Sequence, residues 1–341
     1  MRAPAFWWRE APSPLWRLLA PVALAYGAVA GRRMGRAGGR AALPVVCVGN
    51  FTAGGAGKTP TALALAALLR EAGERPVFLS RGHGGRLPGP LAVEAGRHGP
   101  DEVGDEPPLL ARSGPAVVAR DRPAGAALAH ALRGTVVVMD DGFQNPSLNK
   151  DLSLVVVDGA TGLGNGRVIP AGPLRAPMAA QWPRADAVIV VDEGAAGARV
   201  AGEAAARGLP VLAARLVPDP AAAVGLAGKP VLAFAGIGHP RKFFRTLEAC
   251  GARLVRTRAF PDHHGFGAGE VSKLLREARR EGLVPVTTEK DRVRLEALGL
   301  PADALAAIAV LPVGLAFREP DAVRRMLAAA LDARRSSSMI E

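Results

Sequence analysis

Short apolar runs alternate with helical patterns along most of the chain. The first run, Pro44–Val48, is rich in valine and leads into a glycine-rich loop. The next segment, Thr61–Leu69, carries four leucines and is predicted to be a helix. Continuous apolar strands separated by helices are typical of a parallel sheet covered on both faces, so the fold class is α/β. Further strands are predicted at Val77–Ser80, Ala116–Ala119, Val136–Met139, Leu154–Val157, Ala187–Val191 and Val211–Ala214.

The alternation breaks near Pro218–Pro220 and then resumes as a second α/β unit. Three parts are therefore expected: an N-terminal segment of residues 1–33, a large domain of residues 34–217 and a smaller C-terminal α/β lobe of residues 218–341. A chain of 341 residues is too long for one small core, which agrees with this division. The strands predicted for the second unit are Pro230–Ala235, Val284–Thr287 and Ile308–Leu311.

The N-terminal segment differs from the rest of the chain. An uncharged stretch, Leu18–Gly31, is shorter than the roughly 20 apolar residues that span a bilayer, and Pro21 interrupts it. Aromatic residues at one end and arginines at both favour a segment that lies in the membrane interface. The alternative is an ordinary helix packed on the body of the protein. The flanking residues are Trp7, Trp8, Trp16, Tyr26, Arg32, Arg33 and Arg36.

Charge and cysteine content limit the choice of partners. The net charge is +12, and only six of the 43 basic residues are lysines. Such an arginine excess follows either from a GC-rich genome or from anionic partners such as a lipid surface. No basic block with interleaved aromatic residues is present, so nucleic acid is not expected. Cys47 and Cys250 form no metal-binding or disulfide pattern, which fits a reducing cytosol.

The strongest chemical signal lies between the first strand and the first helix. Gly54-Gly55-Ala56-Gly57-Lys58-Thr59 resembles a phosphate loop, in which backbone N–H groups face a phosphate chain. Lys58 would reach the β- and γ-phosphates, and the Thr59 hydroxyl would hold Mg²⁺. Thr52 stands where the usual pattern has glycine; a glycine-rich turn is the alternative. The nucleotide-binding residues are predicted to be Thr52, Ala53, Gly54, Gly55, Ala56, Gly57, Lys58 and Thr59.

Three further motifs carry acids or histidines. Asp140 and Asp141 end an apolar strand, where a P-loop fold places the acid that orders Mg²⁺; a plain turn is the alternative. Asp105 lies in an acidic loop that is either solvated or a proton acceptor for an attacking hydroxyl. Asp262-His263-His264 is either a general-base dyad, a metal site without a third ligand, or a structural pair.

Two segments look like the guanine-reading motif of GTPases. In Thr288-Glu289-Lys290-Asp291 the lysine is displaced by one position, and after Asn149-Lys150-Asp151 Leu152 stands where aspartate is required. The sequence therefore gives no support for GTP specificity.

Taken together, these motifs resemble the tetraacyldisaccharide 4'-kinases of lipid A synthesis. The family loop also carries threonine at the position of Thr52. The resemblance extends in order from the N-terminal segment to about residue 315. It rests on Val48–Pro60, Ser80–Gly82, Val103–Pro107, Asp140–Gln144, Val156–Gly159, Gly164–Gly166, Pro170–Arg175, Ala235–Gly238, Phe243–Phe244, Asp262–His263 and Thr288–Asp291.

The resemblance implies ATP, Mg²⁺, a lipid-linked disaccharide 1-phosphate and a peripheral position on the cytoplasmic face of the inner membrane. It suggests that Asp105 and His263 activate the 4'-hydroxyl. It also suggests that Asp140 and Asp141 lie at the metal and the reacting phosphate. Thr59 and Asp141 are taken as the metal ligands, although the sequence does not show which of the two acids contacts the metal. The family usually has histidine after Gln144, whereas this chain has Asn145-Pro146-Ser147.

The predicted reaction is transfer of the γ-phosphate of ATP to the 4'-hydroxyl of a tetraacyldisaccharide 1-phosphate, giving the 1,4'-bisphosphate lipid IVA. Lys58 would neutralise charge on the γ-phosphate, while Asp105 and His263 would take the proton. Two alternatives are a P-loop nucleotide switch or metallochaperone and a soluble kinase of a small metabolite. No obligate protein partner is evident from the sequence.

Overall fold

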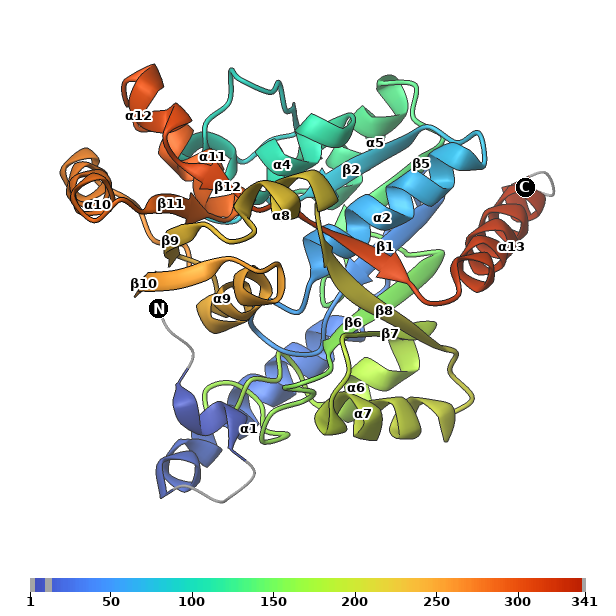
Figure 1. The fold of residues 1–341 in the computed structure, drawn as a ribbon. Coiled ribbons are helices and arrows are strands. Elements are labelled where there is room, and N and C mark those ends of the chain that lie inside the picture. Colours follow the sequence, from blue (N-terminus) through green and yellow to red (C-terminus); the bar gives the residue numbers. More distant parts are fainter. Residues whose placement is uncertain (1–3, 10–13, 339–341) are drawn as a thin grey trace.

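The structure, a computed structural model, describes residues 4–9 and 14–338 and contains two sheets (Figure 1). The larger sheet has nine strands in the order β13-β8-β7-β6-β1-β5-β2-β4-β3. Its strands are β1 (Val45–Gly49), β2 (Pro76–Ser80), β3 (Leu91–Ala92), β4 (Ala116–Val118), β5 (Val136–Asp140), β6 (Leu152–Asp158), β7 (Ala187–Val191), β8 (Val211–Pro218) and β13 (Val313–Phe317).

The centre of this sheet is parallel, and only the edge strands β3 and β13 run antiparallel to their neighbours. Strands β1, β5 and β6 are buried along their whole length, because helices cover both faces. This burial explains why their sequences are continuous apolar runs rather than alternating ones. The predicted mostly parallel α/β sheet is confirmed.

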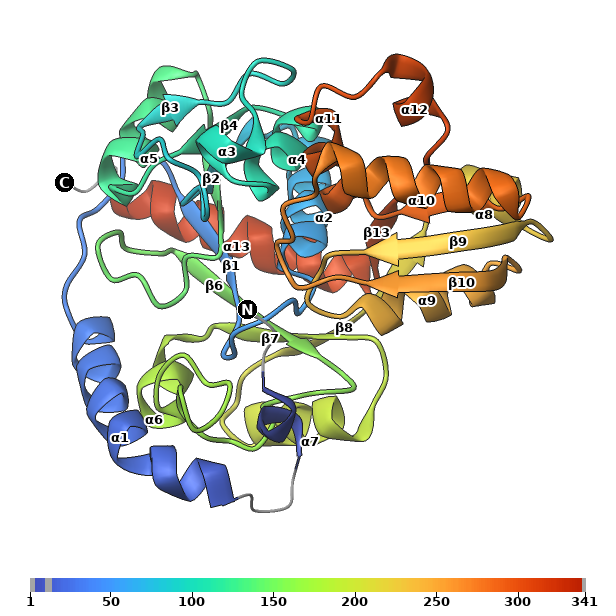
Figure 2. The same ribbon diagram turned by 90° about the vertical axis from the view of Figure 1, so that its left-hand side faces the viewer.

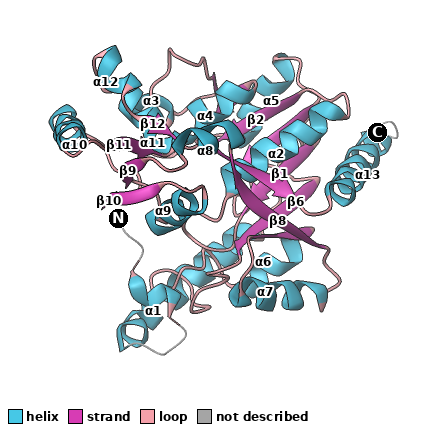
Figure 3. Ribbon diagram, in the orientation of Figure 1, coloured by secondary structure: helices cyan, strands magenta, loops and turns pink. Residues whose placement is uncertain are grey.

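Two layers of helices cover the large sheet (Figure 3). On one face, α2 (Lys58–Glu71), α4 (Glu106–Ser113) and α13 (Pro320–Ser338) contribute Leu65, Leu110 and Leu327 to one core cluster. On the other face, α5 (Arg122–Ala131) and α7 (Ala195–Ala205) contribute to a second cluster. The short helices α3 (Pro100–Val103), α6 (Met178–Gln181) and η2 (Trp182–Arg184) lie in the connections.

The smaller sheet belongs to a second lobe, which lies beside the carboxyl ends of the large sheet's central strands (Figure 2). Its four strands are all parallel, in the order β10-β9-β11-β12. They are β9 (Pro230–Ala235), β10 (Arg253–Ala259), β11 (Val284–Thr287) and β12 (Ala309–Val310). Its helices are α8 (Pro220–Leu226), α9 (Pro240–Ala249), α10 (Ala268–Arg280), α11 (Glu289–Glu296) and α12 (Ala302–Ala306).

The expected boundary of the C-terminal lobe needs a correction. Strand β13 leaves the lobe and pairs antiparallel with β8, and Val323, Leu327 and Leu331 of α13 pack in the core cluster that includes α2. Residues 218–341 therefore do not form one separate lobe, because their last strand and helix complete the large domain. The return is favoured physically because β13 pairs with β8 and α13 buries an apolar stripe.

The N-terminal segment forms η1 (Ala5–Trp8) and α1 (Pro14–Met34). Helix α1 continues through Pro21 and lies against α6, where Gly27 faces Pro177. Most of it is uncovered: Leu18 is 76% exposed and Leu24 is 74% exposed. By length and composition alone, it is the one helix of the described residues that could cross a membrane.

Candidate active site

The phosphate loop connects β1 to α2 and is shaped by its glycines. Gly57, at the N-cap of α2, has a φ of 89°, a left-handed conformation that glycine adopts without a steric cost. Within the described part of the chain, the amides of Gly55, Ala56 and Gly57 donate to no protein acceptor. These free N–H groups at a helix N-terminus form a suitable anion site.

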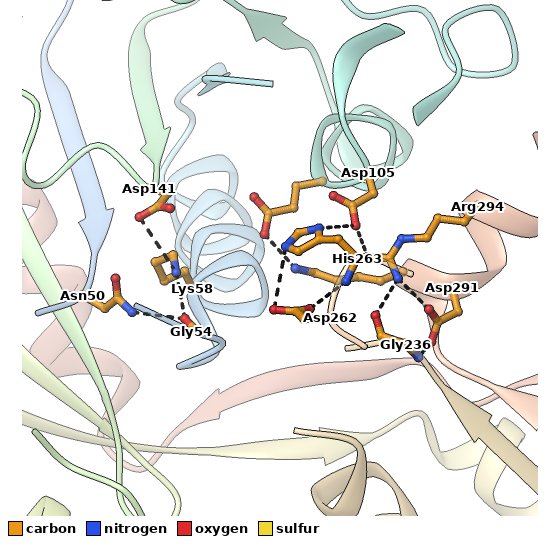
Figure 4. A network of polar contacts seen from close by, with 12 residues as sticks. Asn50, Gly54, Lys58, Asp105, Asp141, Gly236, Asp262, His263, Asp291 and Arg294 are labelled. Atoms are coloured by element: carbon orange, nitrogen blue, oxygen red, sulfur yellow. Dashed lines mark hydrogen bonds and ion pairs between the residues drawn. The ribbon is translucent and has the colours of Figure 1, made fainter. Parts of the chain in front are cut away.

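Lys58 is 8% exposed, with its ammonium group over this loop. Its Nζ donates to the Gly54 carbonyl oxygen at 3.4 Å and lies 3.9 Å from Asp141 Oδ1 (Figure 4). Both distances are long for charge-assisted contacts, so the ammonium group is close to the loop without being fully engaged.

Thr52 and Ala53 have a different role from the glycines that follow. The Ala53 N–H donates to the Pro173 carbonyl oxygen at 2.7 Å, and the Thr52 carbonyl oxygen accepts from Arg175 Nε at 3.1 Å. Their backbone groups therefore fasten the base of the loop to a neighbouring segment. Of the predicted nucleotide-binding residues, Ala53 therefore has its amide engaged within the protein, and Thr52 has its carbonyl engaged.

Asp140 lies at the end of β5, beside the phosphate loop. The Thr59 hydroxyl donates to its Oδ2 at 3.2 Å, whereas its Oδ1 is buried and has no hydrogen-bond partner among the described residues. Burial, followed by the negative charge of Glu106, raises the pKa of Asp140 to about 7. A buried carboxylate oxygen without a partner is costly unless a cation or water meets it.

Asp141 has a φ of 54°, uncommon for a residue with a side chain. Arg175 donates to both of its carboxylate oxygens, at 2.7 and 3.1 Å. Burial alone would raise the pKa of Asp141, but Lys58 and then Arg175 bring it well below its usual range. Asp141 is therefore an ion-paired carboxylate, while Asp140 is the one beside Thr59.

These contacts bear on the metal site. Thr59 and Asp141 are the ligands predicted from the sequence, but the carboxylate that contacts the Thr59 hydroxyl and keeps one unpartnered oxygen is that of Asp140. Hard oxygen donors of this kind suit Mg²⁺, which usually takes one or two protein ligands and completes its shell with water and substrate phosphates. The described residues contain no cluster of three or more acids, histidines or cysteines, as a site held by protein alone would need.

Asp105 and His263 lie 158 positions apart in sequence and meet across the two lobes, with His263 Nδ1 3.0 Å from Asp105 Oδ2. Asp105 occupies the N-cap position of α4, but its side chain makes no capping hydrogen bond and so is free to face the cleft. His263, in the loop after β10, has a side chain that is 43% exposed. One partner is thus buried and the other is accessible.

The charges of this pair are coupled. Burial would raise the pKa of Asp105, but the hydrogen bond with His263 and then the charge of Arg294 bring it well below its ordinary value. The same hydrogen bond raises the pKa of His263. An ionised Asp105 can only accept, so Nδ1 of His263 carries the proton and Nε2 is left to take one.

His264 does not join this pair. Its Nε2 contacts Glu270 at 2.8 Å, and its ring stacks on Phe260 at a centroid distance of 4.6 Å. The structural interpretation of the histidine pair therefore applies to His264, whereas His263 contacts Asp105.

A single cleft of about 2430 Å³ joins these groups. It is lined by the phosphate loop, the acids at the end of β5, the Asp105–His263 pair and Leu19, Tyr26 and Val29 of α1. A volume of this size is larger than a typical small-molecule site. Its lining includes both charged groups around the phosphate loop and apolar side chains of α1.

Several polar residues in the cleft were not predicted from the sequence. Lys290 Nζ contacts Glu106 at 2.7 Å, and Lys242 Nζ contacts Asp158 at 2.8 Å and Asp192 at 2.7 Å. The positions of Arg175, Lys290 and Arg294 in or near sequence motifs could have indicated a role for them. The first two lie in quoted motifs, and Arg294 follows Thr288–Asp291 closely. The loop at Asn145, where the sequence differs from the family pattern, is stabilised by local hydrogen bonds. Asn145 Oδ1 accepts from both the N–H and the hydroxyl of Ser147.

The sequence and the fold both match members of a known family. The tetraacyldisaccharide-1-P 4'-kinase family profile matches residues 15–332. A tetraacyldisaccharide 4'-kinase of Methylobacterium nodulans is 61% identical over 331 residues, covering 96% of each chain. One of a Bradyrhizobium species is 54% identical over 339 residues, covering 99% of this chain and all of the relative. LpxK of Aquifex aeolicus in complex with ATP superposes with a TM-score of 0.71 at 25% identity, over 93% of this chain and 99% of that one.

Proposed function

The chain belongs to the tetraacyldisaccharide-1-phosphate 4'-kinase family, and from this premise we propose which residues carry out the reaction and where it takes place. It is an ATP-dependent phosphotransferase that acts on the 4'-hydroxyl of the lipid A precursor. Neither a nucleotide switch nor a small-metabolite kinase has any comparable support. The observation that carries the site proposal is that one cleft joins a phosphate loop to the Asp105–His263 pair.

The proposed transfer depends on positioning and charge. The loop amides from Gly55 to Gly57 bind the phosphate chain, and Lys58 neutralises the γ-phosphate. His263 Nε2 takes the proton from the 4'-hydroxyl as its oxygen forms a bond to the γ-phosphorus, and the bond to the β-phosphate oxygen breaks to release ADP. Asp105 holds the tautomer of His263 and stabilises the imidazolium that forms.

We propose Thr59 and Asp140 as the residues that hold Mg²⁺, with Asp141 kept in place by Arg175. The support is that the Thr59 hydroxyl contacts Asp140 Oδ2, while Oδ1 of the same carboxylate is buried without a partner among the described residues. The chemistry that Mg²⁺ supplies when bound is neutralisation of charge on the β- and γ-phosphates.

Asp140→Asn is expected to lower kcat and raise the Mg²⁺ concentration needed for half-maximal rate by about 10–100-fold, the scale for losing one metal-site contact. Titrating activity with Mg²⁺ measures this effect. Asp219→Asn is a matched control, because Asp219 caps α8 without lining the cleft and asparagine caps equally well. An unchanged Mg²⁺ dependence in Asp140→Asn would remove Asp140 from the metal site.

We further propose that the enzyme is peripheral to the inner membrane, on its cytoplasmic face, with α1 in the interface. The support is an uncovered row of apolar side chains on α1 next to exposed Arg32, Arg33 and Arg36. Leu19, Tyr26 and Val29 of the same helix also line the cleft, so the acyl chains of the substrate need not leave the bilayer. Arginine side chains next to the membrane interface also pair with anionic headgroups.

Substituting glutamate at Leu18 and Leu24 together is expected to weaken vesicle binding by about 10²-fold or more, since burying each leucine contributes about 1.5–3 kcal/mol. Deletion of residues 1–33 should release the protein similarly. High salt should weaken binding only partly, because burial of apolar groups is not screened. Val224→Glu is the control, since Val224 is 78% exposed on α8 of the other lobe. Equal vesicle sedimentation of all variants would contradict the interfacial position.

The direct test of the whole proposal is incubation with labelled ATP and a monophosphorylated lipid disaccharide in vesicles. The 1,4'-bisphosphate should form with wild-type protein. A water-soluble sugar monophosphate should not be phosphorylated at a comparable rate; the reverse preference would contradict the lipid acceptor.

A further inference from the structure

Arg294 is a buried arginine of α11, in the second lobe, and it reaches across to the large domain. Its side chain is 8% exposed. Its Nη2 donates to Asp105 Oδ2, while its Nη1 donates to the Gly236 carbonyl oxygen at 2.8 Å and to Asp291 Oδ1 at 2.6 Å. Figure 4 shows the guanidinium group between Asp105 on one side and Gly236 and Asp291 on the other.

Two of the three acceptors of Arg294, the Gly236 carbonyl oxygen and Asp105 Oδ2, also contact His263. The Gly236 carbonyl oxygen also accepts from the backbone N–H of His263 at 3.1 Å, and Asp105 Oδ2 also contacts His263 Nδ1 at 3.0 Å. One guanidinium group therefore orders the acceptor that fixes the backbone of His263 and the acceptor that fixes its ring.

His263 needs such support. Its φ is 55°, a left-handed conformation that costs free energy in a residue with a side chain, and its ring is partly exposed in a loop. Residues in this region of φ/ψ space persist only where the surroundings hold them.

Arg294 is itself oriented by Asp291, which accepts a hydrogen bond from its Nη1. Asp291 is fully buried and, besides the arginine, accepts from the Gly236 N–H at 3.0 Å and the Thr288 hydroxyl at 2.8 Å. Gly236 leaves no room for a side chain, because an added Cβ would lie 2.9 Å from His264 Cβ. The clamp is thus built into the connection after β9 and the start of α11.

We propose that Arg294 is a positioning residue for phosphoryl transfer, which clamps the Asp105–His263 pair across the two lobes through Asp105 and the Gly236 carbonyl. The proposal rests on the proposed role of that pair. It requires arginine, because a planar fork reaches two acceptors in fixed directions, whereas the single ammonium group of lysine cannot hold both in that geometry.

The charge of Arg294 has a separate consequence from its geometry. It lowers the pKa of Asp105, after the effects of burial and the His263 hydrogen bond, and it also lowers the pKa of His263. The other charged or titratable groups facing the pair are Lys290, Asp262 and His83. Loss of the arginine charge would raise both pKa values, so the base would become protonated at a higher pH.

The test compares Arg294→Met, Arg294→Lys and Arg292→Met in the full-length enzyme, by kcat, KM for ATP, melting temperature and the pH profile of kcat. Arg292 is the matched control on the same helix, where it contacts Glu296 and the Leu305 carbonyl. Arg294→Met is expected to lose about 10²-fold in kcat, the scale for misplacing a catalytic group by about 1 Å. Its acidic limb should move to higher pH, while KM for ATP stays unchanged.

Arg294→Lys keeps the charge without the fork. It should lose kcat by a smaller factor while its acidic limb stays near the wild-type position, and Arg292→Met should change neither quantity. A kcat within about two-fold of wild type in Arg294→Met would overturn the proposal. A loss of kcat in which the acidic limb of the pH profile does not move, and in which ATP affinity and melting temperature fall together, would also overturn it. That result would indicate a structural role alone.

Asp105→Asn and His263→Ala, measured in parallel, separate the two hypotheses. If both keep the wild-type rate, the proposed role of the pair fails. If both lose rate while Arg294→Met does not, the pair stands and only the clamp fails.

Discussion

Replacing Lys58 with alanine is expected to reduce kcat by at least about 10²–10³-fold, the scale for removing one preorganised electrostatic contact to the transition state. The physical reason is that Lys58 Nζ is buried above the loop amides with only long contacts to Gly54 and Asp141. It is therefore available to the γ-phosphate, where negative charge redistributes during transfer. The measurement is kcat with the lipid acceptor, together with ATP affinity and circular dichroism.

Two controls make this result interpretable. Lys58→Arg keeps the charge but changes its reach, so it should recover only part of the rate. Lys229→Ala removes an exposed lysine after α8 and should leave kcat unchanged. A Lys58→Ala protein with a native spectrum and full activity would exclude Lys58 from the reaction.

The central strands of the fold could be predicted because burial on both faces leaves a continuous apolar signature. Strand β10 could not, since it is an edge strand whose arginines pair with glutamates of α10 and the turn that follows. Arg258 contacts Glu277, and Arg256 contacts Glu281. Strand β13 was missed for a topological reason. Nothing local in Val313–Phe317 indicates that the chain returns to the distant strand β8.

Within the site, what could be predicted was contiguous in sequence. The glycines before Lys58 and the acids at the end of β5 are each recognisable from their immediate sequence neighbours. The meeting of Asp105 with His263 was only implied by the family resemblance, because local patterns do not encode which loops face each other across two lobes. The choice between Asp140 and Asp141 was equally inaccessible. Adjacent side chains point in different directions, so one meets Thr59 and the other Arg175.

Asp105→Ala and His263→Ala are each expected to lower kcat by about 10²–10⁴-fold, the usual contribution of general-base catalysis. A sugar hydroxyl is a poor nucleophile near neutral pH, and the imidazole of His263, oriented by a buried carboxylate at 3.0 Å, is suited to take its proton. ATP affinity should survive, since Lys58 and the loop amides are untouched. Because the two residues act as one unit, the double variant should cost little more than the worse single one.

The pH profile gives an independent measure of the same pair. His263 must be neutral to accept a proton, and its hydrogen bond with Asp105 raises its pKa. Wild-type kcat should therefore fall, as pH decreases, at a pH above the ordinary histidine pKa. Asp105→Ala removes the cause of the raised pKa, so its acidic limb should move to lower pH even though its maximal rate is reduced. His263→Ala should lose this limb.

His264→Ala is the matched control, because it removes an adjacent imidazole that contacts Glu270 and stacks on Phe260 instead of facing Asp105. It should retain most of the rate and the wild-type acidic limb, with at most a modest loss of thermal stability. Strict additivity of the Asp105 and His263 effects would mean that the two residues act separately. An unchanged rate in His263→Ala would mean that another group accepts the proton of the 4'-hydroxyl. The contact between Asp105 and His263 would then be structural.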